Sequence, residues 1–294
     1  MLFRRKQEIT HADTTVRARA KINLTLDVTG RREDGYHTVE MVMQSIALHD
    51  TVRVTTIHGE KKPRGIVLSC SLPFLPTDER NLAYRAAELF YKETGALLET
   101  CEIHIEKRIP VAAGLAAAVL RALNALHTAG LTDDELCEMG LKLGADVPFC
   151  LRGGTMLAQG IGEELSLLPD MPHCWVVLCK PPFAVPTKEV YQEIDSVDIL
   201  EHPDNKGMMA ALNQGDYEGV CAYLSNVMET VTAAKRRQIG EIKSFLAENG
   251  ADGTLMSGSG PTVYGLFSDE SRAKTAAKML RRRFADTFLT ETCN

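Results

Sequence analysis

The segment AKINLTLDV, Ala20 to Val28, decides much of the fold, because it alternates like a strand and carries a lysine inside that pattern. Two later segments, LGADVPFCLRGG (Leu143 to Gly154) and LMSGSGPTVYGLF (Leu255 to Phe267), also join regular apolar sequence to a few small or polar residues. These residue types suit phosphate or hydroxyl chemistry. Together the three segments indicate a small-molecule kinase.

Composition narrows the class of protein. The 294 residues are 45% hydrophobic and 24% charged, which allows a large core in two domains or one large one. The net charge of -6 and the pI near 5.8 give no basic field for nucleic acid or anionic lipid. We therefore expect a small-molecule partner, no nucleic acid and no membrane, and a monomer or homodimer.

The cysteines and the apolar runs indicate a cytoplasmic location. Eight cysteines are scattered without a C-x-x-C pair, so no zinc site is expected and the thiols should be reduced and mostly buried. The N-terminal MLFRRKQEIT has no apolar stretch of a secretory signal. No apolar run approaches the ~20 residues that span a bilayer.

Strand and helix signals run along the chain in an α+β order. A β-meander is expected first, and a helix over Asn81 to Thr94 should stop at Gly95. Thr132 to Glu135 reads as a capping box that starts a helix reaching about Leu143. The other expected strands are 14–28, 38–49, 51–57, 101–107, 253–256 and 262–267, with further strands from Met156 and at 174–179; the other expected helices are 115–129, 187–193, 208–213, 217–225, 233–249 and 270–284.

Two domains are expected from this order. The short linker Met171-Pro172 marks the boundary, which gives an N-terminal domain over 12–170 and a C-terminal domain over 173–290. Strands followed by helices in each half favour α+β over a doubly wound sheet.

Asp146 is the first candidate for chemistry. It lies between two apolar stretches, in Gly-Ala-Asp-Val-Pro-Phe. It could simply cap the following turn. Its functional interpretation is a base that accepts the proton of an attacking hydroxyl during phosphoryl transfer.

Lys21 is the second candidate, because it lies between Ala20 and Ile22 in an apolar strand pattern and its ammonium needs solvent or a polar partner. For the residue taken alone, a lysine at a sheet edge with its ammonium in solvent is the more common explanation. Beside a carboxylate it would instead stabilise the ionised acid and offset charge on the transferred phosphoryl group. Strand alternation places Asn23 on the same face.

The Met256 to Pro261 segment alternates glycine and serine between two strand-like runs. Such a loop can present N–H groups to an anion, although a plain tight turn has the same sequence. Its place after the other two segments favours the functional interpretation.

The chain resembles the GHMP kinase superfamily, whose three motifs occur in this order. It is most similar to the members that phosphorylate a cytidine-diphosphate-linked methylerythritol on its 2-hydroxyl in the non-mevalonate isoprenoid pathway. The resemblance covers about residues 16–284, with AKINLTLDVTGRREDGYH, NLAYRA, EKRIPVAAGLA, GADVPFCLRGGTMLAQGIGE and SGSGPTVYGLF as its most specific segments. It implies an α+β two-domain fold, with a ribosomal protein S5 domain 2-like N-terminal domain and a ferredoxin-like C-terminal domain.

The resemblance also implies roles for individual residues. Lys21 and Asp146 would be the catalytic pair, with ATP as donor and Mg²⁺ as its ion, and no metal ligand is assigned. The implied substrate-binding residues are Asn23, Tyr36, His37, Thr187 and Tyr191, with an aromatic ring on each side of the cytosine and an imidazole on its polar edge. The implied ATP-binding residues are Asn81, Leu82, Lys107, Pro110, Ala113, Gly114, Leu115, Ser257 and Gly258.

One segment departs from the family. Where the family has a Gly- and Ser-rich run whose amides hold the ATP phosphates, Gly114-Leu115-Ala116 leads directly into Ala117. Either several residues of a loop are missing from the sequence as it stands, or the polypeptide lacks them. We expect the first, because phosphate loops without ligand are characteristically mobile.

The expected function is therefore ATP-dependent phosphorylation of that cytidine-linked alcohol. Three alternatives remain at this point: a kinase for another small alcohol, a non-catalytic binding protein with the kinase fold but no working phosphate loop, and a nucleic-acid-binding module with an S5-like fold. The acidic balance disfavours the last.

Overall fold

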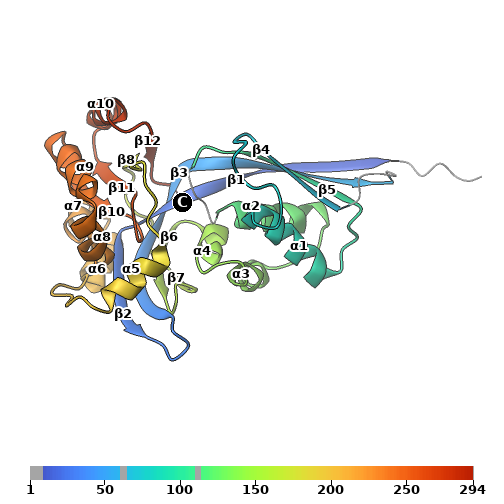
Figure 1. The fold of residues 1–294 in the computed structure, drawn as a ribbon, viewed down its shortest axis with the longest axis horizontal. Coiled ribbons are helices and arrows are strands. Elements are labelled where there is room, and N and C mark those ends of the chain that lie inside the picture. Colours follow the sequence, from blue (N-terminus) through green and yellow to red (C-terminus); the bar gives the residue numbers. More distant parts are fainter. Residues whose placement is uncertain (1–8, 60–64, 110–113, 294) are drawn as a thin grey trace, which may run out of the picture. The chain divides into compact units, whose positions relative to one another are not determined.

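The structure is a computed structural model that describes residues 9–59, 65–109 and 114–293. The chain packs into two compact units (Figure 1). The first unit comprises Met1–Ala20 and Leu48–Arg152, and the second comprises Lys21–Ala47 and Gly153–Asn294. The expected division at residues 170–173 stays a prediction, and the compact units are divided differently, because Lys21–Ala47 packs with the C-terminal part of the chain.

The first unit is a sheet with helices on one face. Helices α1 to α4 all lie on the same side of its strands in Figure 1. Strand β5 pairs antiparallel with the second half of β3, from Thr51 opposite Glu106 to Ile57 opposite Thr100, and parallel with β4. The elements are the first part of β1 (Thr10–Asn23), the second part of β3 (His37–His58), β4 (Gly65–Cys70), α1 (Leu82–Thr94), β5 (Thr100–Glu106), α2 (Gly114–Leu126), α3 (Asp133–Leu141) and α4 (Val147–Arg152).

Local signals predicted the helix ends of this unit well. Asn81 caps α1 by accepting a hydrogen bond from Ala83 N at 3.0 Å, and Gly95 ends the helix in the left-handed conformation. The capping box of Thr132 and Glu135 is present at the start of α3. The predicted stop at Gly95 and the predicted capping box are confirmed, although α3 ends at Leu141 and α2 ends at Leu126, slightly before the expected residues.

The second unit is built on two groups of strands. In the first group, the first half of β3 pairs with β2 and β6, and β2 also pairs with β9 in parallel. The second group is an antiparallel sheet in the order β10-β11-β8-β12, against which α9 and α10 pack. The elements are β2 (Thr25–Arg31), β6 (Thr155–Gln159), β7 (Glu164–Leu167), β8 (Trp175–Cys179), α5 (Thr187–Ile194), α6 (Asn205–Gln214), α7 (Tyr217–Ala222), β9 (Ser225–Asn226), α8 (Met228–Lys235), α9 (Arg237–Glu248), β10 (Gly253–Met256), β11 (Val263–Phe267), α10 (Glu270–Arg281) and β12 (Thr287–Glu291).

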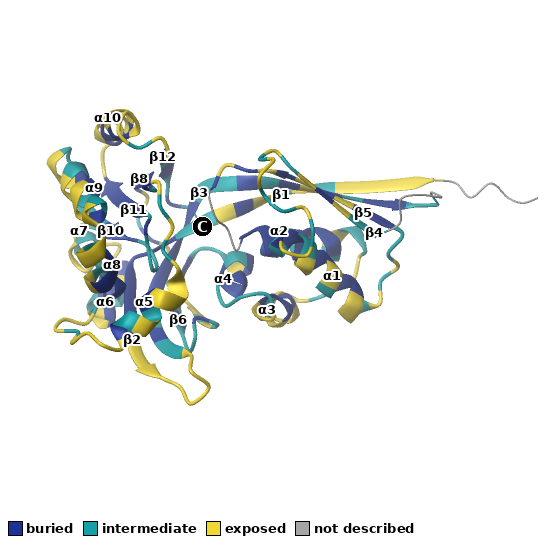
Figure 2. Ribbon diagram, in the orientation of Figure 1, coloured by how far each residue is buried: buried dark blue, intermediate teal, exposed yellow. Residues whose placement is uncertain are grey.

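Burial follows the faces of these elements. Figure 2 shows α9 with a buried side and an exposed side, as expected of a helix that covers a sheet. Helix α2 is instead mostly buried. Every residue of β11 is buried, which explains its unbroken apolar sequence.

Several expected elements were wrong in their extent. Residues 38–49 and 51–57 form one strand, β3, while residues 14–28 are divided between β1 and β2, and residues 233–249 between α8 and α9. The strands β4, β7, β9 and β12 and the short helix α4 were not expected at all, and Ser225, expected in a helix, lies in β9. Each of these misses is short or is decided by contacts far along the sequence.

All eight cysteines are free, three of them buried and five half-buried, so the expectation of mostly buried thiols was too strong. Burial raises the pKa of the Cys101 thiol to about 11. No helix in the described ranges is long and apolar enough to cross a membrane.

A buried ion pair fixes the chain where β5 ends. Lys107 Nζ lies 2.7 Å from Asp50 Oδ2, and the two side chains are 3% and 0% exposed. The other oxygen of Asp50 accepts hydrogen bonds from the backbone N–H groups of Arg108 at 2.6 Å and Ile109 at 2.8 Å. Lys107 Nζ also donates to the Ile109 carbonyl. Asp50, the residue that separates the expected strands 38–49 and 51–57, therefore anchors the chain just after β5.

Replacing Asp50 with asparagine should destabilise the protein by about 3 kcal/mol, because it leaves the buried Lys107 ammonium without its counter-charge. The free energy of unfolding, measured in urea, tests this. Asp13→Asn is the matched control, since Asp13 pairs with Arg53 on the surface and should cost less than about 1 kcal/mol. Equal effects of the two substitutions would contradict the assignment of Asp50.

Candidate active site

Lys21 and Asn23 meet at the end of β1. Lys21 Nζ donates to Asn23 Oδ1 at 2.9 Å, and Asn23 is fully buried. The prediction that these two residues share one face of the strand is confirmed. The contact restricts the lysine side chain and directs its ammonium along the strand face.

The Gly- and Ser-rich loop after β10 is bonded to the same asparagine. Asn23 N donates to Ser257 Oγ at 3.3 Å, and Ser257 Oγ donates to Asn23 Oδ1 at 3.3 Å. Tyr264 OH donates to the Asn23 carbonyl at 2.8 Å, and burial raises the pKa of this phenol, which keeps it protonated as a donor. The first and third sequence segments therefore form one hydrogen-bonded group in the second unit.

Asn226 shapes the loop itself. Its side-chain amide donates to the carbonyls of Met256 at 2.7 Å and Gly258 at 2.9 Å. Gly258 has a φ of +60°, a backbone conformation that favours glycine. Sequence reasoning missed Asn226, because its partners are about 30 residues away.

Asp146 lies in the turn between α3 and α4 and is half-buried. Its carbonyl accepts a hydrogen bond from Cys150 N at 3.2 Å, so it stands at the start of α4. Gly140 allows α4 to approach α3 closely, since a Cβ there would lie 2.8 Å from Val147 Cγ1. The turn that carries Asp146 is thus held against packed helix.

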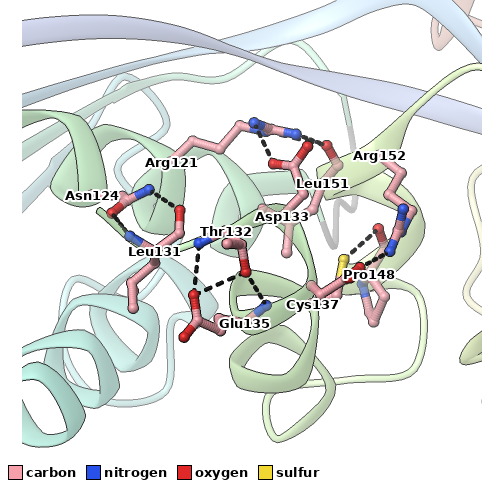
Figure 3. A network of polar contacts seen from close by, with 11 residues as sticks. Arg121, Asn124, Leu131, Thr132, Asp133, Glu135, Cys137, Pro148, Leu151 and Arg152 are labelled. Carbon is pink, nitrogen blue, oxygen red and sulfur yellow. Dashed lines mark hydrogen bonds and ion pairs between the residues drawn. The ribbon is translucent and has the colours of Figure 1, made fainter. Parts of the chain in front are cut away.

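A polar network joins the three helices around this turn (Figure 3). Arg121 on α2 donates to the Leu151 carbonyl on α4 and pairs with Asp133 on α3 at 3.3 Å. Cys137 Sγ donates to the Pro148 carbonyl at 3.7 Å. These contacts cross between helices, so they restrict movement of α4 and of the carboxylate that precedes it.

The residues predicted to bind ATP are mostly engaged within the first unit. Asn81 uses both ends of its amide, because it caps α1 and donates to the Pro76 carbonyl at 2.8 Å. The Lys107 ammonium lies in the buried pair with Asp50. Leu82 is half-buried beside the capping residue. Pro110 and Ala113 lie outside the described residues.

The first turn of α2 is built as core. Gly114 and Leu115 are buried, the next five residues are each at most 2% exposed, and a Cβ at Gly114 would lie 2.8 Å from the Arg19 carbonyl oxygen. The full sequence passes directly from Ala116 to Ala117 within this helix. The sequence as it stands therefore has no Gly- and Ser-rich run at this point, and the expectation that loop residues are missing from it stays a prediction.

A second group of predicted residues surrounds His37. The His37 ring stacks on Tyr191, with centroids 4.9 Å apart and an interplanar angle of 21°, and His37 Nε2 lies 2.7 Å from Asp195 Oδ1. Tyr36 is 62% exposed. Thr187 Oγ1 lies 2.9 Å from Ser259 Oγ, next to the Ser257 loop. Asp195 was missed, although it follows Tyr191 at the helical spacing of four residues.

The described part of the chain holds no group of three or more His, Cys, Asp or Glu residues placed to bind a metal ion. Lys21, Asn23, Ser257, Gly258, Tyr36, His37, Thr187 and Tyr191 belong to the second unit, and Asp146 and the remaining predicted residues belong to the first.

Two family models match the chain: GHMP kinases N terminal domain over residues 81–154, and GHMP kinases C terminal over residues 208–286. Among curated proteins, the 4-diphosphocytidyl-2-C-methyl-D-erythritol kinase of Clostridium botulinum (strain Alaska E43 / Type E3) is 44% identical over 283 residues, covering 94% of this chain and 99% of that protein. The enzyme of the same name from Brevibacillus brevis is 45% identical over 281 residues, covering 94% of each chain.

Solved structures of GHMP kinases are also similar to this chain. A crystal structure of 4-(cytidine 5'-diphospho)-2C-methyl-D-erythritol kinase superposes with a TM-score of 0.80 at 31% identity, covering 96% of this chain and 100% of that one. L. major mevalonate kinase in complex with R-mevalonate gives 0.73 at 16% identity, covering 95% and 96%, which is likeness of fold alone. The chain is a two-domain GHMP kinase, and it belongs to the 4-diphosphocytidyl-2-C-methyl-D-erythritol kinase family.

Proposed function

We propose that this chain transfers the γ-phosphoryl group of ATP to the 2-hydroxyl of 4-diphosphocytidyl-2-C-methyl-D-erythritol, in the cytoplasm, as a step of non-mevalonate isoprenoid synthesis. The single observation that carries the proposal is the Lys21–Asn23–Ser257 group, in which two separate sequence motifs of a kinase are hydrogen-bonded together. The near-complete alignment with relatives of that name supports the same substrate.

Asp146 is the proposed general base. As the substrate oxygen attacks the γ-phosphorus, its proton passes to the Asp146 carboxylate, and the bond between the γ-phosphorus and the bridging oxygen breaks to release ADP. The cross-helix network of Arg121 and its partners supports this role, because a base must be held in place to act.

Lys21 is the proposed cation that offsets negative charge on the transferred group. Its ammonium is restrained by the bond to Asn23 at 2.9 Å, so less rotational freedom is lost when it acts. Asn23 and Ser257 position it, and Gly258 lets the loop backbone approach an anion.

Mg²⁺ would enter this reaction on ATP. In kinases the ion is held by phosphate oxygens with one or two carboxylates rather than by a complete protein cage. No ligand of the ion is assigned to this chain, because the Asp146 carboxylate is proposed to accept the substrate proton. The ion would neutralise charge on the β- and γ-phosphates.

The cytidine end of the substrate is proposed to bind around His37. Exposed Tyr36 offers a ring face for stacking, and the His37 imidazole and the Thr187 hydroxyl offer hydrogen bonds. Tyr191 supplies a second aromatic ring through its stack on His37.

The buried start of α2 favours a second candidate function. Without a Gly- and Ser-rich run, the first turn of this helix is packed in core instead of offering amides to phosphate. A chain of this kind could bind the cytidine-linked alcohol without phosphorylating it. The acceptor residues of the second unit would then serve binding alone.

An acceptor panel tests the proposed function. With ATP and Mg²⁺, release of ADP should require 4-diphosphocytidyl-2-C-methyl-D-erythritol, and homoserine or mevalonate should give less than about a hundredth of that rate. Turnover of mevalonate or homoserine instead would leave only the superfamily assignment. Binding of the cytidine compound without any ADP release would favour the second candidate.

Asp146→Asn should lower kcat by about 10²- to 10⁴-fold, because the amide cannot accept the hydroxyl proton. The affinity for ADP, measured by calorimetry, should change little. Asp13→Asn, which removes a surface carboxylate of the same unit, serves as the control and should leave kcat unchanged. Near-normal turnover by Asp146→Asn would refute its role as base.

A further inference from the structure

Two side chains of one helix hold the His37 ring. Tyr191 lies on α5 and stacks on the face of the imidazole, and Asp195, the C-cap residue of the same helix, lies 2.7 Å from its Nε2 edge. The spacing of four residues places both on one side of the helix. The His37 side chain is only 7% exposed. The plane and the direction of the ring are therefore both determined.

Asp195 does not stabilise the helix that carries it. The C-terminal end of a helix has a partial negative charge and prefers a cation, so a carboxylate at this position is unfavourable. Arg31 lies 3.1 Å from the second oxygen of Asp195 and compensates this charge from β2. An acidic residue at an unfavourable place, directed at a buried imidazole, indicates a role in that contact.

The contact assigns the hydrogen on the ring. The hydrogen bond from His37 lowers the pKa of the Asp195 carboxyl, and the Arg31 charge acts in the same direction. An ionised carboxylate only accepts hydrogen bonds, so Nε2 must carry the hydrogen. In the neutral imidazole the other nitrogen, Nδ1, is then an acceptor, and it has no hydrogen-bond partner among the described residues.

We propose that Asp195 is a positioning residue that makes this site select cytosine over uracil, by fixing the His37 tautomer with Nδ1 as acceptor. The inference rests on the cytidine end of the proposed function, although not on phosphoryl transfer. Cytosine carries an amino group at its 4-position, which donates to such an acceptor. Uracil carries a carbonyl oxygen there, which would face the Nδ1 lone pair.

The test compares binding of cytidine 5'-diphosphate and uridine 5'-diphosphate by calorimetry, without ATP. Wild type should prefer the cytidine compound by about tenfold or more, the effect of one satisfied hydrogen bond. Asp195→Asn should lose most of that preference, because the asparagine amide can donate to Nε2 and shift the hydrogen to Nδ1. Glu193→Gln is the matched control, since Glu193 lies on the same helix and pairs with Lys235 at 2.6 Å instead.

A second readout follows the tautomer directly. The ¹⁵N chemical shifts of His37 should report a hydrogen on Nε2 in wild type and in Glu193→Gln, and a shift toward Nδ1 in Asp195→Asn. A general loss of folding would weaken binding of both nucleotides without moving the ratio between them.

The outcomes separate this inference from the proposed function. An unchanged preference in Asp195→Asn, a hydrogen on Nδ1 in wild type, or no binding of either nucleotide by wild type would overturn the inference. A preference that depends on Asp195 in a protein that releases no ADP would support it while the kinase proposal fails. Turnover by wild type together with an unchanged preference in Asp195→Asn would retain the kinase and reject the role of Asp195.

Discussion

Asn23 is the polar group on which the second unit depends most. It is fully buried, so its amide and carbonyl groups need partners inside the protein, because a buried polar group without one costs about 1–3 kcal/mol. Ser257 and Tyr264, more than 230 residues away, provide partners for its backbone and side chain. This requirement fixes the end of β1 against the Gly- and Ser-rich loop. The Lys21 ammonium, bonded to the same side chain, takes its direction from that arrangement.

The motifs that the chain shares with GHMP kinases are more complete in the second unit than in the first. In the second unit, the hydrogen-bonded group around Asn23 and the His37 ring held by Asp195 keep the polar groups that we propose to bind the acceptor. In the first unit the run after Gly114 is an alanine-rich helix start with nearly every side chain in the core. A shortened phosphate segment changes the part of a kinase that holds the donor, while the part that recognises the acceptor is specified elsewhere in the chain. Phosphate contacts with ATP must then come from other groups than the amides of an extended loop.

The sequence was informative where the physical cause is local. The Gly95 stop and the capping box at Thr132 each involve residues within a few positions, and both were predicted correctly. The Asn81 cap is equally local but was not predicted. The continuity of β3 was not predictable, because Asp50 looks like a turn residue until its partner Lys107 is placed 57 positions away. Asp195 was missed for the same reason, since His37 is 158 positions away. Most candidate residues came from the family resemblance. The structure then showed that some of them, such as Asn81 and Lys107, also make contacts that stabilise the fold.

The central claim is that the Lys21 ammonium and the Asp146 carboxylate act in one chemical step. A double-mutant cycle on kcat/KM for phosphorylation of the cytidine-linked alcohol tests this most directly, with Lys21→Ala, Asp146→Ala and the double variant. If both groups serve the same transition state, the double variant should lose little more activity than the more damaging single variant. Losses in transition-state free energy that simply add would contradict the account, because the two residues would then act independently.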